Sequence, residues 1–346
     1  MEAGKLWGLR RLADDAGRFK MLAVDQRPPI KNLIAERRQL DTAPYEDVCD
    51  FKALLVEELA PFASASLLDP HFAYPAAIHL VPPSQGLLLT LEDSVFEDLP
   101  EGRRSAEIDN WSVDKIKRAG GDAVKVLAWY RPDAGSEILE HQHEFVRRIG
   151  EACRRYDIPF VFELLVYAFA GAASHTTDYV EDTAKRAEDV IASVEAFADP
   201  SFGVDLFKLE SPFPAGDVPD RAADDGSVQA AFDALGRAAG RPWVMLSAGA
   251  TQDAFARILE YAYAAGANGY LAGRAIWWDA CQSFPDLEAM RSRLRGDSVP
   301  YMEQLNRLTD ELATPWTSSP GMLGEATLDG AGAGFRNQYG NLGVSQ

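Results

Sequence analysis

Cysteine and basic residues are both scarce in this chain of 346 residues. The cysteines Cys49, Cys153 and Cys281 are odd in number and form no CxxC spacing, which argues against a disulfide framework and predicts reduced packing residues. With 34 Lys and Arg against 53 Asp and Glu, the formal net charge is -19. Such an acidic chain is not expected to bind nucleic acid or an anionic membrane, although a local group of basic side chains still suits a small anionic ligand.

Long apolar runs and the common cofactor motifs are also missing. The first twenty residues lack the apolar core of a signal peptide, and no run approaches the length of a membrane span. Neither GxGxxG after the first apolar run nor GxxxxGK(S/T) occurs. Among the five histidines, His141 and His143 share a helical segment, but a spacing of two points their side chains apart. We therefore predict a cytoplasmic protein without a metal site or a cofactor.

What is present is a regular alternation of apolar runs with amphipathic segments of helix length. Two of the helical segments are 46–62 and 253–266, the second ending on a glycine. Repeated strand–helix alternation without a break in composition predicts an α/β fold with a single (β/α)8 (TIM) barrel over residues 1–316, not two domains. The strand-length runs are 19–26, 63–70, 86–92, 122–130, 159–167, 205–212, 242–249 and 268–274.

The end of the chain differs from the rest. Residues 317–346 form a Gly-rich C-terminal extension, and seven glycines fall in the last 27 residues. We expect a loosely ordered extension; a lid, or a strap onto a neighbouring subunit, is the less favoured alternative.

Polar residues gather where the predicted strands end, which is the face of such a barrel that carries the active site. Two lysines, Lys125 and Lys208, lie inside strands among apolar residues. Strand alternation places Lys208 on the same face as Glu210, and Glu163 on the same face as Leu165 and Tyr167. The polar residues at the strand ends are Asp25, Arg27, Asp69, Glu92, Glu163, Lys208, Glu210, Ser247 and Arg274.

A buried lysine needs a reason, because burying an unpaired ammonium is costly. One interpretation pairs Lys208 with Glu163, and Lys125 with Asp25, as ion pairs that fill the barrel. Such pairs seldom stabilise a protein more than apolar packing does, so we favour chemistry. A neutral lysine attacks a carbonyl to form a Schiff base, and both desolvation and a nearby cation such as Lys125 favour the neutral amine. Glu163, on the neighbouring strand, is the expected proton shuttle.

Two glycine-containing segments, LSAGA (246–250) and LAGRA (271–275), follow the seventh and eighth strands. The loops at these places are the usual phosphate site of a TIM barrel, where backbone N–H groups approach the anion. Ser247 and Arg274 add side-chain donors. The alternative is that Gly249 and Gly273 only form tight turns.

Taken in chain order, these segments resemble the tagatose-1,6-bisphosphate aldolase family, the class I ketose-bisphosphate aldolases, from about residue 21 to residue 316. This sequence departs from the family where Pro28 and Pro29 follow Arg27, in LESPFP after Lys208, and in the glycine-rich tail. The segments that carry the resemblance are DQR (25–27), LLDPHFAYPAA (67–77), DAVKVLAWY (122–130), IPFVFELLVY (158–167), FGVDLFKLESP (202–212), LSAGA (246–250) and AGRAIW (272–277).

The resemblance implies a role for each matching residue. Lys208 is the Schiff-base lysine, Glu163 the acid/base and Lys125 a neighbouring cation of the active site. Ser247, Gly249, Gly273 and Arg274 are expected at the C1 phosphate. Asp25, Gln26 and Arg27 are expected to line the pocket, with Arg27 near the distal anionic group.

The expected activity is metal-independent cleavage of a phosphorylated ketose, tagatose 1,6-bisphosphate, to dihydroxyacetone phosphate and glyceraldehyde 3-phosphate. One alternative is a sulfofructose-1-phosphate aldolase, which forms sulfolactaldehyde in place of glyceraldehyde 3-phosphate. Another is a barrel that binds a phosphosugar without turnover. The expected partner is the small phosphosugar substrate, and a homo-oligomer is plausible for the fold.

Overall fold

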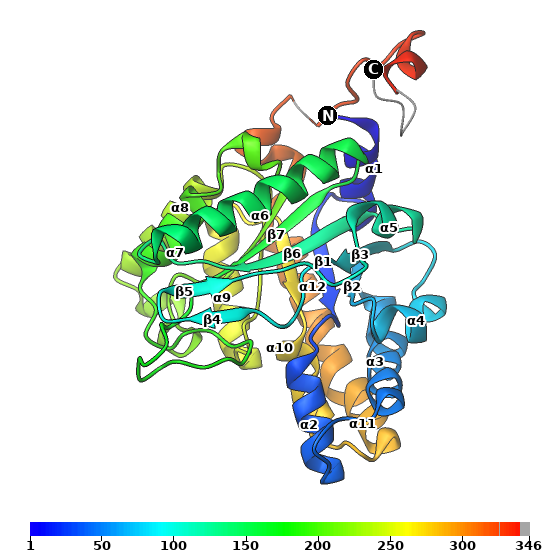
Figure 1. The fold of residues 1–346 in the computed structure, drawn as a ribbon, viewed down its shortest axis with the longest axis vertical. Helices are drawn as coiled ribbons and strands as arrows, with labels where there is room; N and C mark the ends of the chain where they lie inside the picture. The colour runs from blue at the N-terminus through cyan, green and yellow to red at the C-terminus, as the bar shows by residue number, and fades with distance from the viewer. Residues whose placement is uncertain (325, 340–346) are drawn as a thin grey trace.

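The computed structural model describes residues 1–324 and 326–339, and within them a closed barrel of parallel strands is enclosed by helices (Figure 1). Around the barrel the strands follow the order β1-β10-β9-β8-β7-β6-β3-β2, and β1 pairs with both β2 and β10 to close it. The predicted single (β/α)8 barrel is confirmed, and each of the eight strands lies inside a predicted apolar run. The strands are β1 (Phe19–Ala23), β2 (Ala65–Leu68), β3 (Gly86–Thr90), β6 (Ala123–Trp129), β7 (Phe160–Leu165), β8 (Leu206–Leu209), β9 (Trp243–Met245) and β10 (Gly269–Ala272).

The helices cover the outer face of the barrel, and their apolar stripes pack on outward-facing strand residues such as Val126, Phe162 and Phe207. The predicted helix at 46–62 appears as α3 with a 3₁₀ turn, Ala60–Phe62, after it. The helix predicted at 253–266 is α9, followed by Gly266 at φ +92°, a conformation that glycine adopts without strain. The helices are α1 (Ala3–Leu12), α2 (Pro28–Arg38), α3 (Tyr45–Leu59), α4 (Ala73–Ala77), α5 (Val113–Arg118), α6 (Ser136–Arg155), α7 (Ala187–Glu195), α8 (Ser227–Ala239), α9 (Gln252–Ala264), α10 (Arg274–Cys281), α11 (Leu287–Arg293) and α12 (Val299–Leu312). Within the described residues, no helix has the length and apolar character that crossing a membrane requires.

The interior of the barrel is layered, because successive inward-facing positions on each strand carry different kinds of residue. An apolar floor comes first, and α1 and Trp316 close it from outside. Two residues further along β6, β7 and β8 stand Lys125, Glu163 and Lys208. Above them lies an apolar rim. The floor includes Met21, Leu67, Leu88, Ala123, Val161, Leu206, Val244 and Leu271, and the rim is Leu127, Trp129, Leu165, Tyr167 and Leu246.

An antiparallel hairpin, β4 (Glu97–Leu99) and β5 (Gly102–Arg104), lies outside the barrel sheet and was not predicted. Its Arg103 is 1% exposed, and the guanidinium lies over the rings of Trp129 and Tyr167, at 4.6 and 4.8 Å from the centroids. These cation–π contacts fix the hairpin against the rim of the barrel.

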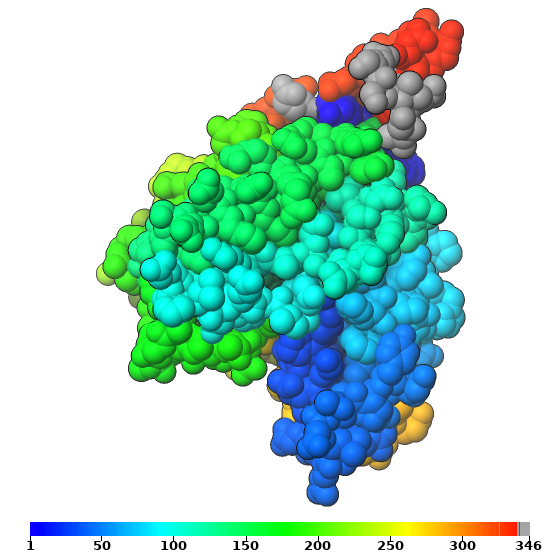
Figure 2. Space-filling view, viewed as in Figure 1, coloured from blue at the N-terminus to red at the C-terminus, as the bar shows by residue number. Residues whose placement is uncertain are grey.

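The described part of the predicted C-terminal extension returns to the N-terminus of the chain, at one end of the molecule (Figures 1 and 2). The Met1 amino group donates to the Thr327 carbonyl oxygen at 3.0 Å and pairs with Asp329 at 2.6 Å. Residues 325 and 340–346 of the extension lie outside the described residues. In the space-filling view α2 projects at the other end of the molecule (Figure 2).

Candidate active site

Lys208, Glu163 and Lys125 meet inside the barrel, in the layer between the floor and the rim. Glu163 and Lys208 are directly paired positions on β7 and β8, so their side chains emerge side by side. Lys208 Nζ donates to Glu163 Oε2 at 2.9 Å, and Lys125 Nζ reaches the same oxygen at 2.8 Å. All three side chains are buried. Both ion pairs of the structural interpretation are therefore present, but they belong to one larger network.

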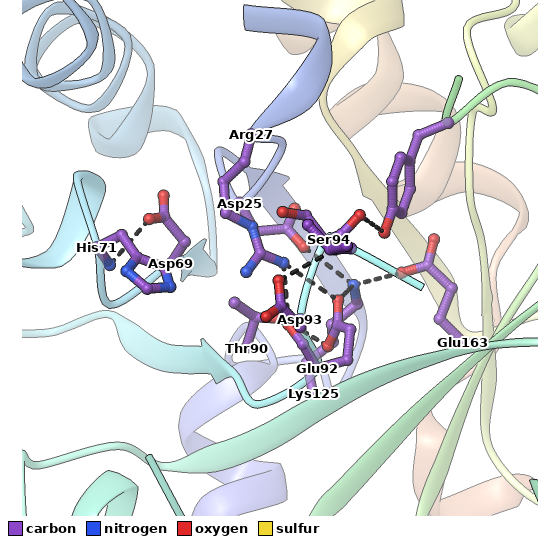
Figure 3. A network of polar contacts seen from close by, with 12 residues as sticks. Asp25, Arg27, Asp69, His71, Thr90, Glu92, Asp93, Ser94, Lys125 and Glu163 are labelled. Atoms are coloured by element: carbon purple, nitrogen blue, oxygen red, sulfur yellow. Dashed lines mark hydrogen bonds and ion pairs between the residues drawn. The ribbon is translucent and has the colours of Figure 1, made fainter. Parts of the chain in front are cut away.

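Lys125 is the centre of that network (Figure 3). Besides Glu163, its ammonium group contacts Asp25 Oδ2 at 2.9 Å and Glu92 Oε1 at 2.6 Å. Although burial opposes the charged form, the pKa of Lys125 is raised well above its ordinary value because Asp25, Glu163 and Glu92 surround it. Lys125 is therefore a fixed positive charge.

Two carboxylates of the layer, Glu163 and Asp25, are kept ionised by the positive charges beside them. Burial alone would raise the pKa of Glu163, but the charges of Lys125 and Lys208 hold it below the usual value. The same two lysines, with Arg27, hold the pKa of Asp25 far below the aspartate range despite its burial. A carboxylate that stays ionised between two lysines is suited to accept a proton from one of them.

The loop after β1 places polar atoms against this layer. Arg27 Nη2 donates to the Glu92 carbonyl oxygen at 3.0 Å, and Pro28 and Pro29, at the start of α2, restrict the loop. Among the described residues, Arg27 Nε and Nη1, Gln26 Oε1 and Asp25 Oδ1 are buried without a hydrogen-bond partner. Buried polar atoms without partners are rare, so this loop is suited to a polar or anionic ligand.

The loops after β9 and β10 bring the second set of predicted residues to the same place. Gly273 precedes α10 and is required by close packing, because a Cβ there would lie 2.5 Å from the Ala23 carbonyl oxygen. Gly249 has φ +90°. Arg274 is the first residue of α10, and burial lowers the pKa of its guanidinium, although Glu163 and Asp25 oppose this.

These residues surround a small cavity, which we call the central cavity. Every predicted site residue lines it except Gly249, which lines a neighbouring depression, the outer groove. Water-accessible space is about 50 Å³ in the central cavity and about 620 Å³ in the outer groove. The polar residues of the central cavity are Asp25, Gln26, Arg27, Glu92, Ser94, Lys125, Glu163, Tyr179, Lys208, Ser247 and Arg274.

Sequence reasoning did not assign three of these residues to the site. Glu92 stood out as a polar residue at the end of a strand, but nothing in the sequence indicated its contact with Lys125. Ser94 and Tyr179 belong to irregular segments that carry no periodic signal. The Tyr179 hydroxyl donates to the Ser94 carbonyl oxygen at 2.9 Å.

Glu210 was expected to share a face with Lys208, and it does not line the central cavity. Strand β8 ends at Leu209, so alternation no longer governs Glu210. Its carboxylate pairs with Lys185 at 2.8 Å and accepts from the Val166 backbone N–H at 2.6 Å. Burial raises the pKa of Glu210 although Lys185 opposes this.

Comparison with protein families gives a match over most of the barrel. The family model described as "DeoC/LacD family aldolase" matches residues 19–279. A "Tagatose 1,6-diphosphate aldolase" of Listeria monocytogenes serovar 1/2a is 35% identical over 330 residues, which covers 92% of this chain and 95% of the relative. The "Tagatose 1,6-diphosphate aldolase" of Lactococcus lactis subsp. lactis is 33% identical over 322 residues, covering 89% and 96%.

Solved structures with low sequence identity share the fold. A fructose-bisphosphate aldolase from Plasmodium falciparum superposes with a TM-score of 0.64 at 14% identity, covering 89% of this chain and 94% of its own. A Schiff-base-forming fructose-1,6-bisphosphate aldolase gives a TM-score of 0.55 at 18% identity, covering 88% and 99%. At these identities the likeness supports the barrel fold alone.

Proposed function

Because the chain belongs to the DeoC/LacD family of aldolases, we propose that it is a class I aldolase that cleaves tagatose 1,6-bisphosphate through a Schiff base on Lys208. The products are dihydroxyacetone phosphate and glyceraldehyde 3-phosphate. The observation that carries the proposal is the 2.9 Å contact between Lys208 Nζ and Glu163 Oε2 in a buried layer of the barrel. A nucleophile in hydrogen-bond contact with a base is what covalent catalysis at a carbonyl requires.

The first half of the reaction forms the iminium ion. Lys208 gives a proton to Glu163, and its amine attacks the C2 carbonyl to form a carbinolamine. Glu163 returns the proton to the carbinolamine hydroxyl, which leaves as water. Lys125 stays charged beside Glu163 and keeps the carboxylate ionised between these proton transfers.

The second half breaks the carbon–carbon bond. Glu163 removes the proton of the C4 hydroxyl, directly or through water, and the C3–C4 bond pair moves into the iminium ion to form an enamine. The aldehyde half leaves. Glu163, which now carries this proton, returns it to C3 of the enamine, and hydrolysis of the resulting iminium ion by water releases dihydroxyacetone phosphate and restores the Lys208 amine.

The two ends of the substrate need two anion sites. We assign the C1 phosphate to Ser247, Gly249, Gly273 and Arg274, beside the start of α10, where the partial positive charge of the helix dipole adds to the guanidinium. We assign the C6 phosphate to Arg27, whose buried Nε and Nη1 donors lack protein partners among the described residues, and Gln26 lines the pocket beside it. These assignments also give Asp25, beside Lys125, a place next to the reacting carbons.

Borohydride reduction in the presence of dihydroxyacetone phosphate tests the nucleophile. Peptide mapping should find the three-carbon adduct on Lys208. The wild type should turn over substrate in the presence of a chelator, and Lys208→Met should lose both this turnover and the adduct. Lys20→Met removes a lysine that pairs with Asp14 and Asp310 outside the site and serves as the control. An adduct on Lys125, or none at all, would sink the assignment.

A substrate comparison tests the C6 group. The ratio of kcat/KM for tagatose 1,6-bisphosphate over sulfofructose 1-phosphate should exceed one in the wild type and fall in Arg27→Ala. Losing a charge-assisted contact costs about tenfold or more in kcat/KM. A preference for the sulfonate would replace the proposed substrate and leave the chemistry at Lys208 in place.

A further inference from the structure

A three-residue segment, Asp178–Val180, separates the central cavity from the outer groove. Tyr179 lines the central cavity, whereas its neighbours Asp178 and Val180 line the outer groove. Arg274 lines both. The segment and the Arg274 side chain therefore form the wall between the two spaces. With about 50 Å³ open to water, the central cavity holds only a few water molecules, so it must widen before a ketose bisphosphate binds, and the wall toward the outer groove is one boundary at which it can widen.

The wall is held in place by Tyr179. Its backbone carbonyl oxygen accepts a hydrogen bond from Arg274 Nη2, and its hydroxyl donates to the Ser94 carbonyl oxygen at 2.9 Å. Its ring packs against Trp129 with centroids 5.2 Å apart and against Phe96 at 6.1 Å. In this structure the guanidinium assigned to the C1 phosphate is therefore bound to the backbone of the protein itself.

Both flanks of the segment have tertiary contacts of their own. Before it, Arg103 Nη2 donates to the Thr176 carbonyl oxygen, and His175 contacts Asp98 at 2.7 Å. After it, Glu181 accepts from the Ala215 N–H at 2.9 Å and pairs with the buried Lys185 at 2.8 Å.

We propose that Tyr179 is a specificity-determining residue: it closes the path to Lys208 until a phosphate group takes Arg274 from the Tyr179 carbonyl oxygen. This rests on the proposed function, because it gives Arg274 the C1 phosphate. A phosphate dianion accepts two charge-assisted hydrogen bonds from a guanidinium, and a neutral carbonyl oxygen competes poorly with it. An unphosphorylated ketone has nothing to offer Arg274 and meets the closed wall. The phosphate thus acts on access to the nucleophile as well as on binding.

The first test uses the wild-type protein and supplies the ketone and the phosphate as two separate molecules. Dihydroxyacetone, which lacks the phosphate, is trapped on Lys208 with borohydride in the presence and absence of inorganic phosphate. Inorganic phosphate should accelerate adduct formation about tenfold, the effect of one charge-assisted contact. An unchanged rate, while dihydroxyacetone phosphate still labels Lys208, would overturn this inference alone. Absence of the dihydroxyacetone phosphate adduct would instead overturn the proposed function.

The second test removes the closing residue. Tyr179→Ala should label with dihydroxyacetone about as fast as the phosphate-activated wild type and gain less than about twofold from added phosphate. Tyr179→Phe, which loses only the bond to Ser94, should lie between the two. Tyr74→Phe is the matched control, since it removes a tyrosine hydroxyl bound to a backbone carbonyl, that of Ala119, away from both spaces.

Two results would contradict the role of Tyr179. If phosphate accelerates labelling of Tyr179→Ala as much as that of the wild type, the acceleration comes from buffer catalysis or from phosphate held by Arg274, and not from opening of the wall. If inorganic phosphate accelerates labelling of Tyr179→Phe by the same factor as labelling of the wild type, the bond from the Tyr179 hydroxyl to Ser94 does not hold the wall closed. If Tyr179→Ala fails to fold, the phenylalanine variant and the wild-type comparison still decide the matter.

Discussion

Lys125 contacts three carboxylates, and its charge helps to hold the pKa values of two of them, Asp25 and Glu163, below the usual range inside the barrel. Asp25, Glu92 and Glu163 all lie within 2.9 Å of its ammonium group. Without a central cation, neighbouring carboxylates raise one another's pKa and at least one of them becomes protonated. Lys125 thereby keeps Glu163 available as a base, which is a different role from the charge repulsion on Lys208 expected from the sequence.

Replacing Lys125 should reveal this dependence in the pH profile. In Lys125→Met the pKa of Glu163 rises, because one of the two charges that hold it down is gone. The acid limb of kcat/KM should therefore move to higher pH, and kcat should fall by about 10²-fold or more. Steady-state rates between pH 4 and pH 9 measure both effects. Lys20→Met should leave the profile unchanged, and an acid limb that stays in place in Lys125→Met would contradict this role.

The residue types of the site were predictable from the sequence, but the contacts among them were only partly so. Apolar runs interrupted by Lys125, Glu163 and Lys208 mark inward positions, because the outer strand face is covered by helices. The pair Lys208–Glu163 follows from strand order, because β7 and β8 are neighbours, whereas Lys125 and Asp25 come from strands that are not adjacent and meet across the barrel interior. That Lys125 also reaches Glu92 and Glu163 depends on strand register and side-chain rotamers, which no local pattern encodes.

At the scale of elements, the segments that cover the barrel mouth were the hardest to predict. Hairpin β4–β5 has the sequences EDL and GRR, which contain neither the alternation nor the β-branched residues typical of strands. The long connection between β7 and α7 has no helical or strand period. Both are held by tertiary contacts such as the stacking of Arg103 on Trp129. Periodicity identifies segments that bury one regular face of a helix or strand. The hairpin and the connection bury side chains at irregular spacings, so periodicity does not detect them.

The contact between Lys185 and Glu210 ties that connection to the end of β8, two residues beyond Lys208. The Lys185 side chain is fully buried and pairs with Glu210 at 2.8 Å. Glu210 also accepts from the Val166 N–H, at the start of the connection. One buried carboxylate thus holds both ends of the segment that carries Tyr179.

Lys185→Met should destabilise the protein strongly. The change leaves Glu210 as an unpaired buried carboxylate, which costs about 3–5 kcal/mol in the free energy of unfolding. The loss should be smaller at pH 5 than at pH 8. Removing Lys185 raises the pKa of Glu210 further, and stability then falls as pH rises from the unfolded-state pKa toward the folded-state pKa. Chemical denaturation at the two pH values measures this.

A double variant provides the control for the ion pair. Adding Glu210→Gln to Lys185→Met removes the uncompensated charge and keeps an acceptor for the Val166 N–H, so most of the lost stability should return. If the double variant is no more stable than Lys185→Met, packing of the lysine side chain is the cause, and the charge argument is wrong.

At the scale of the whole molecule, the two ends of the barrel are built for different tasks. The end where the strands begin is closed by the apolar floor, α1 and Trp316, and the described part of the tail lies beside α1 (Figure 1). The end where the strands finish carries the charged layer and the wall formed by residues 178–180 and Arg274. For the described residues, the tail is far from the proposed chemistry, which agrees with an extension more than with a lid.

The charged side chains are also distributed unequally between the surface and the interior. The protein carries a formal net charge of -19, whereas the central cavity is lined by four basic side chains, Arg27, Lys125, Lys208 and Arg274, and three carboxylates, Asp25, Glu92 and Glu163. An anionic substrate is therefore repelled at long range and attracted only at close range. Salt screens the interaction between distant exposed charges and leaves buried contacts nearly unaffected.

Unlike an enzyme with an electropositive surface, this one should gain speed as salt is added. Raising potassium chloride from about 10 to 150 mM shortens the Debye length from about 30 to 8 Å. We expect kcat/KM for the bisphosphate to rise about threefold as the repulsion is screened. Labelling by uncharged dihydroxyacetone should not change. A fall in kcat/KM would mean that the field at the mouth is attractive. Because its cations are buried, the enzyme approaches its full association rate at the ionic strength of a cell rather than in dilute buffer.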